Sequence, residues 1–519
     1  MKPAKAALTG LLALLAALAA GHLVAAFVGP SASPYLAVGN AAIDLTPSWL
    51  KDFAVTTFGT NDKLVLLTGM AIVLAGIGAA AGLASRTTPT PGTAVAVALG
   101  LVGIAAVLTR PDVGQLSVLA PMASLAAGAY TFRYLHKLSQ ESESSQSASH
   151  QSAAQQSASH QGTSPNTQPT EDNSRRGFLI TAALSVAAAA VGQFWGNRTD
   201  VEGSRTAVGD LTPKTKAPEI PINADFAKDG TPSFITSGKD FYRIDTALSV
   251  PRIRAEEWTL RVHGMVDRPM VLTFDEIRNR DLIEETVTLT CVSNEVGGPY
   301  ISNANFIGIK IGDVLREAGV KQGADQLFST SDDGFTAGSP LDYVLERGLI
   351  AIGMNGEPLP AEHGFPARLV VPGLYGYVSA TKWVTDLNVT TFAKEQGYWI
   401  PRGWAARAPI KTMSRIDRPK GLSKIQGRTT VAGTAWAQPK GVAKVEVRAD
   451  GGPWQEAELG ADVSDSTWRM WRLELDLKPG SHTVECRATD KSGYTQDQAR
   501  LDPIPDGATG WHSISFTVQ

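Results

Sequence analysis

The stretch V-T-L-T-C-V-S-N-E-V-G-G spans residues 287 to 298 and carries Cys291, one of only two cysteines in 519 residues. So few cysteines exclude a disulfide-stabilised scaffold. Val287 to Thr290 have strand character, and the Gly297-Gly298 pair then breaks regular structure. The pattern predicts a thiol at the edge between a strand and a loop. Such a thiol can ligate a metal, act as a nucleophile or pack in a core.

The composition of the chain divides it into a membrane part and a soluble part. Apolar residues make up 43% of the sequence, and the long Ala, Leu, Val and Gly tracts lie within the first 195 residues. The formal net charge is -3, which offers no basic surface. We therefore expect no nucleic-acid partner.

Four apolar tracts before residue 137 are long enough to cross a bilayer, which needs roughly 20 residues per helix. They are residues 6–28, 64–84, 93–109 and 115–135. Their flanking Lys and Arg residues fall on one side if the N-terminus is cytoplasmic. A cleaved secretory signal over the first tract is the alternative. Because His22 is the only histidine within a tract, we expect no membrane haem.

Residues 138–174 repeat Ser, Gln, Ala and His and predict a disordered linker. Ser174 precedes the segment 175–196, which starts with R-R-G-F-L and continues as an Ala-rich apolar stretch. This order favours a twin-arginine export signal, and an ordinary fifth membrane helix is the alternative. Either one places the rest of the chain outside the cytoplasm. A second linker is predicted over 197–222.

Residues 223–410 predict an α+β domain, because short strands and helices alternate there without a strict βαβ rhythm. W-T-L-R-V-H-G (258–264) and V-T-L-T-C are typical of strands. L-T-F-D-E-I-R-N-R (272–280) predicts a helix with Thr273 and Glu276 as a capping box. Residues 311–320 predict a helix that ends at Gly319.

From residue 411 to 519 the pattern is all β. Alternating segments such as A-K-V-E-V-R-A and H-T-V-E-C-R-A-T-D are separated by turn residues such as Pro479-Gly480. This pattern predicts an immunoglobulin-like β-sandwich. Cys486 alternates inward with Val484, so we expect it in the core.

Several motifs occur in order over nearly 300 residues: T-L-T-C-V-S-N, M-N-G-E-P-L-P (354–360), H-G-F-P-A-R-L-V-V-P (363–372), K-W-V (382–384) and S-R-I-D-R-P. In their order and spacing, residues 223–519 resemble the sulfite oxidase family of molybdopterin enzymes. The resemblance implies a multi-domain, membrane-anchored bacterial oxidoreductase whose C-terminal β domain forms dimers.

The resemblance also implies the cofactor and its contacts. Cys291 occupies the position of the thiolate that ligates molybdenum, while the pterin supplies the other sulfur ligands. The residues that match cofactor-binding positions are Tyr242, Arg243, Ser331, His363, Arg368, Ser379, Ala380, Thr381 and Lys382. Cys291, Tyr242, Arg243 and Trp404 match positions beside the reacting centre.

Three positions depart from the pattern of animal and plant sulfite oxidases. Asp245 stands where those enzymes have an arginine, and Trp404 falls near their active-site tyrosine. Lys440 lies near the position from which their β domain contributes a basic residue, in a loose alignment. These departures leave the anion pocket for sulfite incomplete.

The predicted function is oxidation of sulfite or a related small oxyanion outside the cytoplasmic membrane, with electrons passed to a separate cytochrome or quinone. No haem-binding segment is recognised. One alternative is reduction of an S-oxide or N-oxide, as in periplasmic methionine sulfoxide reductases, although those lack the β domain. The other alternative is a non-enzymatic adhesion protein.

Overall fold

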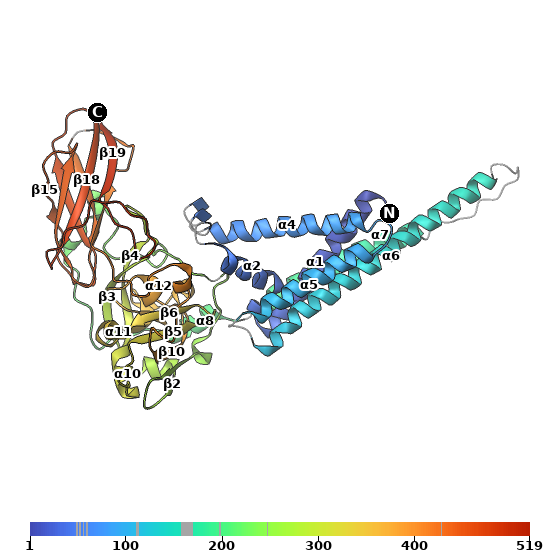
Figure 1. Cartoon of the computed structure of the whole chain (residues 1–519), viewed down its shortest axis with the longest axis horizontal. Coiled ribbons are helices and arrows are strands. Elements are labelled where there is room, and N and C mark those ends of the chain that lie inside the picture. Colours follow the sequence, from blue (N-terminus) through green and yellow to red (C-terminus); the bar gives the residue numbers. More distant parts are fainter. Residues whose placement is uncertain are drawn as a thin grey trace. The chain divides into compact units, whose positions relative to one another are not determined.

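The computed structural model describes residues 1–519 except 48–49, 51–52, 55–56, 59–60, 111–113, 157–169, 197–198, 247 and 427. The chain divides into two compact units, unit 1 (Met1–Thr199) and unit 2 (Asp200–Gln519). The described part of unit 1 is helical, whereas all of the sheets lie in unit 2 (Figure 1).

Unit 1 holds the apolar tracts in helices that pack closely. These are α1 (Pro3–Val28), α2 (Pro34–Leu45), α4 (Asp62–Ala84), α5 (Thr90–Leu108), α6 (Leu119–Gln156) and α7 (Thr170–Gly196). Helix α1 packs against α4, α6 and α7. A Cβ on Gly10 would lie 1.9 Å from the carbonyl oxygen of Gly78, so glycine is what allows α1 and α4 to meet.

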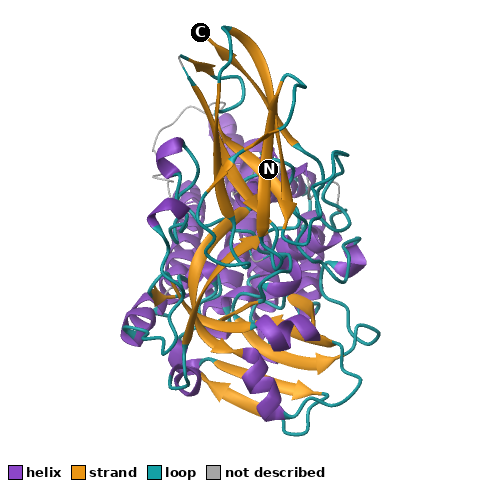
Figure 2. Ribbon diagram, turned by 90° about the vertical axis from the view of Figure 1, so that its left-hand side faces the viewer, coloured by secondary structure: helices purple, strands orange, loops and turns teal. Residues whose placement is uncertain are grey.

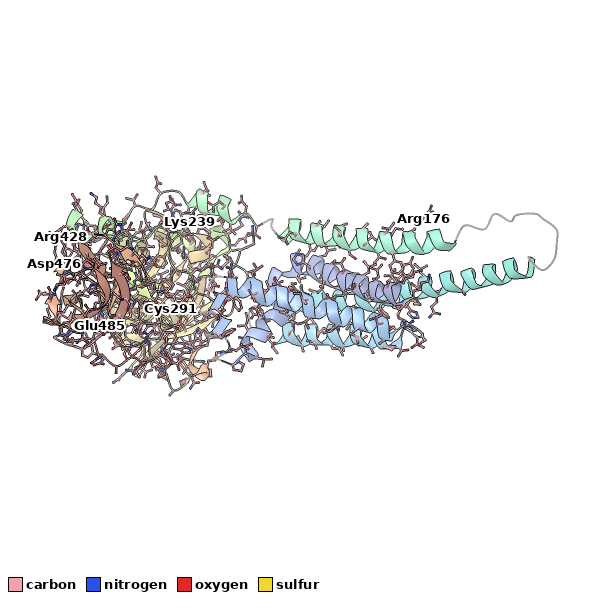
Figure 3. All side chains as sticks on the ribbon, turned by 90° about the horizontal axis from the view of Figure 1, so that it is seen from above. Arg176, Lys239, Cys291, Arg428, Asp476 and Glu485 are labelled. Carbon is pink, nitrogen blue, oxygen red and sulfur yellow. The ribbon has the colours of Figure 1, made fainter. Side chains whose placement is uncertain are left out.

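Four helices in the described part of the chain are long and apolar enough to cross a membrane, which is compatible with membrane anchoring. They are Pro3–Val28, Asp62–Ala84, Thr90–Leu108 and Arg176–Gln193. Three agree with predicted spans, and the last lies in α7, where Figure 3 labels Arg176. The predicted span 115–135 is not among them. It forms a 3-10 turn (Gln115–Val118) and the start of α6, and Arg133 and its neighbouring tyrosines lower its hydropathy.

The two predicted linkers are more ordered than the composition indicated. Helix α6 continues to Gln156, because Ala, Glu and Gln extend a helix that an apolar segment has already nucleated. The prediction of disorder from residue 138 is therefore wrong for this part. Residues 157–169 lie outside the described residues, and those from Thr170 belong to α7.

The predicted linker 197–222 contains helix α8 (Val201–Val208), so the boundary at residue 223 is wrong and unit 2 begins at Asp200. Asp200 caps the helix by accepting a hydrogen bond from the Gly203 N–H at 2.7 Å. Val201 and Val208 are buried in the core of unit 2. Polar residues dominate this segment, but the spacing of its few apolar residues still gives one helix face that can be buried.

The first part of unit 2 is the predicted α+β domain and is built on two sheets, one mixed and one antiparallel. One has the order β2-β1-β10-β5-β6: β2 (Met270–Thr273), β1 (Thr259–Gly264), β10 (Val384–Thr390), β5 (Gln326–Ser331) and β6 (Thr336–Pro340). The other has the order β3-β4-β7-β8, with β9 beside β7: β3 (Ile283–Thr290), β4 (Ile301–Lys310), β7 (Leu349–Met354), β8 (Glu357–Pro358) and β9 (Arg368–Val370). Residues of both sheets share one hydrophobic core.

Short helices connect these strands: α9 (Phe274–Arg278), α10 (Ile311–Ala318), α11 (Leu341–Arg347) and α12 (Gly376–Ser379). The capping box predicted for the first of them is confirmed, since both Thr273 and Glu276 make its hydrogen bonds. Gly319 ends α10 with φ +73°, as predicted. Capping residues in the sequence therefore predicted the start of α9 and the end of α10.

The second part of unit 2 is a two-sheet β domain (Figure 2). One sheet has the order β11-β13-β17-β16: β11 (Met413–Arg418), β13 (Thr429–Trp436), β17 (Arg469–Leu475) and β16 (Glu458–Leu459). The other has the order β12-β19-β18-β14-β15: β12 (Lys424–Ile425), β19 (His512–Val518), β18 (Gly480–Asp490), β14 (Val442–Ala449) and β15 (Gln455–Glu456). Residues of both sheets form a second core that includes Cys486, as predicted.

The two parts of unit 2 are joined by buried contacts. The Trp468 indole N–H donates to the Phe234 carbonyl at 3.0 Å, and the Trp468 backbone N–H donates to the Thr288 hydroxyl at 2.8 Å. The Gln438 amide donates to the Thr288 carbonyl at 3.0 Å. Because Thr288 lies on β3, the β domain is attached directly to the strand that leads to Cys291.

Candidate active site

Cys291 is the first residue after β3 and starts a compact loop. Its backbone N–H donates to the Tyr300 carbonyl at 3.0 Å, and the Tyr300 N–H donates to the Asn294 side chain at 2.8 Å. The Cys291 sulfur lies 2.9 Å from the Ser293 hydroxyl oxygen. Burial raises the pKa of the thiol, while the hydrogen bond to Ser293 acts in the opposite direction. Figure 3 labels Cys291 in unit 2.

The β domain contacts the far side of this loop. Arg415, on β11, donates to the Gly298 carbonyl at 2.8 Å and is itself paired with Asp417 at 2.8 Å. The His512 ring lies against Gly297, where a Cβ would be 2.3 Å from the imidazole Nε2. The Gly297-Gly298 pair therefore does more than end a strand, since it allows two β-domain side chains to approach the Cys291 loop.

Two tyrosines, the partly buried Tyr242 and the buried Tyr375, lie within electrostatic range of Cys291. Burial raises the pKa of Tyr242, and a negative charge on Cys291 raises it further. Burial likewise raises the pKa of Tyr375, with smaller contributions from Asp506 and Cys291. Both phenols are therefore neutral at ordinary pH and can donate hydrogen bonds. The role predicted for Tyr242 beside the thiol stays a prediction.

Arg368 and His363 form a buried pair of polar side chains near Tyr242. The Arg368 guanidinium donates to the carbonyls of His363 and Ala380 at 3.1 and 3.3 Å, and its buried Nε has no hydrogen-bond partner in the described part of the chain. The His363 Nε2 contacts the Gly238 carbonyl at 2.7 Å. Burial lowers the pKa of Arg368 to about 10 and that of His363 to about 4. Arg368 is thus cationic and His363 neutral near pH 7.

Lys382 and Arg243 both contact the carboxylate of Asp245. The Lys382 Nζ and the Arg243 Nε lie 2.6 and 2.9 Å from Asp245 Oδ2. The side chains of Lys382 and Asp245 are 10% and 4% exposed. Burial lowers the pKa of Lys382 to about 8, although Asp245 acts in the opposite direction. Asp245, which aligns with an arginine of relatives, therefore lies with the basic residues that match the cofactor-binding segment.

The remaining predicted cofactor contacts are spread along neighbouring loops. The Ser379 hydroxyl donates to the Leu374 and Tyr375 carbonyls at 3.0 Å, and Thr381 shares a hydrogen bond with Ser329 at 2.8 Å. Ala380 presents its carbonyl to Arg368. Ser331 ends β5, where its hydroxyl bonds to Asp333 and accepts from the Phe335 N–H. These serine and threonine hydroxyls hold the loops in shape.

Two predicted substrate positions have other contacts. Trp404 is buried against Tyr377 and Trp399, with ring centroids 5.8 and 6.4 Å apart. The structure shows no hydrogen bond from its indole within the described residues. The Lys440 ammonium lies 3.1 Å from Asp490 Oδ2 and above the Tyr494 ring, so the loose expectation that it reaches the substrate is not supported. Lys440 lies in the connection between β13 and β14, where it pairs with the buried carboxylate of Asp490.

Sequence reasoning missed four residues of this site. Tyr375 lies in L-Y-G-Y, directly before the glycine that begins α12. The glycine next to this tyrosine was the only feature of the sequence that could have pointed to it. Ser293 stands two residues after the cysteine. Arg415 and His512 are more than 100 residues distant in sequence and carried no signal, because only folding brings the β domain onto the loop.

The side chains present fit a molybdenum cofactor that brings its own ligands. Among the described residues no three His, Cys, Asp or Glu side chains cluster as a metal site. A single thiolate suffices, however, if a pterin supplies further sulfur ligands. Two buried polar atoms, Arg368 Nε and the Oγ1 of Thr290, the residue before Cys291, have no partner among the described residues and are available to a bound polar group. Arg368 and Lys382 supply the positive charge that a phosphate requires.

Comparisons with known proteins agree with this fit. Residues 247–399 match the family model of the oxidoreductase molybdopterin binding domain. Human mitochondrial sulfite oxidase is 28% identical over 344 residues, which cover 56% of this chain and 62% of the human protein. The uncharacterized oxidoreductase YuiH of Bacillus subtilis is 36% identical over 154 residues, which cover 29% of this chain and 74% of YuiH.

A solved structure of the sulfane dehydrogenase SoxCD from Paracoccus pantotrophus is also similar. It shares 23% sequence identity with a TM-score of 0.49, covering 54% of this chain and 80% of that one. The chain thus spans less than two thirds of the human relative and most of the shorter bacterial one.

Proposed function

Because the chain belongs to the sulfite oxidase family of molybdopterin-dependent oxidoreductases, with molybdenum-molybdopterin as its cofactor, we propose that it oxidises sulfite or a related small oxyanion. In this reaction sulfite and water give sulfate, two protons and two electrons. A separate cytochrome or quinone accepts the electrons. Family membership removes the non-enzymatic adhesion alternative.

The observation that carries the proposal is the grouping of a partly exposed thiol with buried polar side chains at one end of β3. Cys291 is only half-buried, whereas Cys486, the other cysteine, is fully buried in the β domain. Tyr242 and Arg368 are linked electrostatically to each other, and Tyr242 is linked to Cys291. A soft ligand, a neutral hydrogen-bond donor and a cation are therefore available together.

We assign the following roles to the chain's own residues. Cys291 loses its proton and binds the metal, because the thiolate is the ligating form. His363, Arg368 and Lys382 hold the pterin, and the two cations neutralise its phosphate. The bound cofactor supplies two-electron oxygen-atom transfer. Tyr242 stays protonated because its pKa is raised by burial, so it orients an oxygen of the substrate as a donor and does not act as a base.

We further propose that Arg175 and Arg176 belong to a twin-arginine signal and that unit 2 works outside the cytoplasm. The support is the S-R-R-G-F-L order at the start of a helix apolar enough to cross a membrane. Twin-arginine export would carry the folded unit with its cofactor already bound. Fusion of residues 138–196 to a reporter that folds only in the cytoplasm tests this, since loss of export in an R175K/R176K variant is expected.

We also assign the β domain as immunoglobulin-like and as a surface for dimers. The support is its strand order. If β11 to β19 are lettered in chain order with the two-residue strands β12 and β15 left out, β11-β13-β17-β16 corresponds to strands A, B, E and D, and β19-β18-β14 corresponds to G, F and C. Analytical ultracentrifugation of the full chain in detergent tests the dimer, which a constant monomer mass would contradict.

The decisive experiment measures molybdenum, pterin and activity on the purified full-length protein. We expect close to one molybdenum per chain and sulfite-dependent reduction of a dye acceptor. Equal and negligible molybdenum in the wild type and in C291S would contradict the proposal. Assays with sulfoxides and a reduced viologen run beside it.

Those assays address a second candidate, reduction of an S-oxide or N-oxide. The observation that favours it is the position of Asp245, whose carboxylate contacts Lys382 and also pairs with Arg243, a cation that could otherwise attract an oxyanion. In addition, Trp404 and Tyr377 offer an aromatic wall suited to an organic substrate. Viologen-dependent reduction of a sulfoxide without sulfite oxidation would favour this candidate.

A further inference from the structure

The helical unit contains an apolar cavity of 110 Å³ that the proposed function does not use. Its walls come from five helices: α1, α2, α4, α5 and α6. None of the lining side chains is charged, and only Tyr35 and Ser124 carry a side-chain oxygen. Any occupant is therefore a neutral, largely apolar molecule.

The helices that form this cavity pack tightly beside it, so the cavity is a local feature and not the result of loose packing throughout the bundle. A Cβ on Gly100 would lie 2.5 Å from the Leu125 side chain, and one on Gly92 would lie 1.9 Å from the Phe132 ring. Both glycines line the cavity. They bring α5 against α6 at these two levels, while the space between them stays open.

Ser124 gives the cavity one polar group in need of a partner. It is 8% exposed, and its hydroxyl makes no hydrogen bond within the described part of the chain. The other polar group, the Tyr35 hydroxyl, already donates to the Leu67 carbonyl of α4. A hydroxyl more than nine-tenths buried that lines a cavity is suited to bind an oxygen of an occupant.

We propose that this cavity binds the ring of a membrane quinone, with one ring carbonyl accepting a hydrogen bond from Ser124. An enclosed apolar cavity of about 150 Å³ is known to bind benzene. This cavity, at 110 Å³, is smaller but is open on one side, so a six-membered ring can enter it edge first without being fully enclosed. The open side of the cavity leaves a path for an isoprenoid tail. The choice of a quinone rests on the proposed function, which needs a carrier for two electrons, and the cavity offers no charge for an ionic ligand.

The test uses full-length protein in lipid nanodiscs and isothermal titration calorimetry with ring-sized probes. The probes are 2,3-dimethyl-1,4-benzoquinone, the oxygen-free o-xylene, and oleic acid as an acyl chain. S124A removes the hydroxyl, and A96L fills the cavity from α5. S185A and A98L are matched controls, because Ser185 lies on α7 with its hydroxyl bonded to Thr181, and Ala98 is exposed on α5.

We expect wild-type protein to bind one quinone. S124A weakens quinone binding about fivefold to tenfold and leaves o-xylene unchanged, because one hydrogen bond is lost. A96L weakens both by more than tenfold, and the two controls match the wild type. Quinone binding that neither variant alters would overturn the proposal. An A96L variant that binds oleic acid more weakly but the quinone as the wild type does would also overturn it.

Titration of C291S separates this proposal from the proposed function. We expect C291S to lack activity and to bind the quinone as the wild type does. Quinone binding sensitive to S124A and A96L in a protein that never oxidises sulfite would overturn the proposed function alone. Sulfite oxidation in a protein whose quinone binding is insensitive to both variants would overturn the quinone site alone.

Discussion

The two cysteines show how differently this molecule uses the same side chain in its two β-rich regions. Both follow alternating residues typical of strands. Cys486 lies within β18, points into the sandwich and is fully buried. Burial raises its pKa to about 12, and the Ser414 hydroxyl donates to its sulfur at 3.3 Å. Cys291 lies one residue beyond β3, where it is half-buried beside Ser293.

This difference shows that the position relative to the end of the strand, and not the residue type, decides how far each cysteine is buried. Within the sandwich the Cys486 sulfur is enclosed by both sheets, with Ser414 of the opposite sheet donating to it. Beyond the last residue of β3 the chain turns away, and Tyr242, Tyr375 and the β-domain residues Arg415 and His512 gather around the loop. A thiol at such an edge can meet a ligand from outside the fold.

The largest expected effect is on metal binding. We expect C291S to lose nearly all molybdenum and at least 1000-fold in activity, since a hydroxyl does not replace a soft thiolate. C486S should retain molybdenum, because Cys486 is a core residue, and should cost about 1 to 3 kcal/mol in stability. Elemental analysis and urea unfolding check both. Loss of molybdenum in C486S would break the contrast between the two thiols.

The second effect is on thiol reactivity in cofactor-free protein. Burial raises the pKa of both thiols, so both react more slowly than a free cysteine near pH 8. Because Cys291 is partly exposed and Cys486 is not, we expect Cys291 to react with iodoacetamide at least 100-fold faster. Mass spectrometry of tryptic peptides measures both rates. Comparable rates would show that β18 opens as readily as the Cys291 loop.

A third prediction concerns the coupling between the two regions. R415M removes the donor to the Gly298 carbonyl and leaves Asp417 buried without its cation, so we expect a loss of about 3 kcal/mol in unfolding free energy and faster alkylation of Cys291. The double variant R415M/D417L should regain most of the stability, because no buried charge remains, and should keep the faster alkylation.

That double variant is the decisive control. If alkylation of Cys291 returned to the wild-type rate together with stability, Arg415 would act on overall stability and not on the loop.

The last prediction concerns a pH dependence of stability. Burial lowers the pKa of His363 and of His512 to about 4, below the ordinary value of about 6.5. Between these values the unfolded chain binds more protons than the folded chain, so stability is full above pH 6.5 and is lost as the pH falls. At pH 5 each histidine should cost about 2 kcal/mol.

Urea unfolding followed by Trp fluorescence at pH 7 and pH 5 measures this loss. H512N keeps a side-chain acceptor for the Ile416 N–H and cannot be protonated, so it should remove about half of the pH dependence. An unchanged slope in H512N would show that His512 is already solvated when the domain is folded.

The fold was predictable wherever local chemistry decided it. Alternation identified the strands of both domains, and the capping box at Thr273 fixed α9. The predictions were wrong at residues 138–156 and 200–208, where polar composition concealed helices. In α8 the two valines that determine the structure are outnumbered by exposed polar residues, and only the core of unit 2 makes them decisive.

Motifs in the sequence nominated residues for the site but not their contacts. Cys291, His363, Arg368 and Lys382 were chosen by their motifs, and their roles stay predictions. The pairing of Asp245 with Lys382 joins residues 137 positions apart. No pattern in either segment indicates that contact, since any basic residue can satisfy a carboxylate.

The sequence by itself determined the kinds of element, the family motifs and the rarity of its thiols, because these depend on residue type and on spacing within one segment. Tertiary structure alone decided which thiol lies at an open edge, which cations are already paired, and which β-domain side chains hold the Cys291 loop. Those outcomes depend on burial and on distances between segments far apart in the chain, which local spacing does not encode.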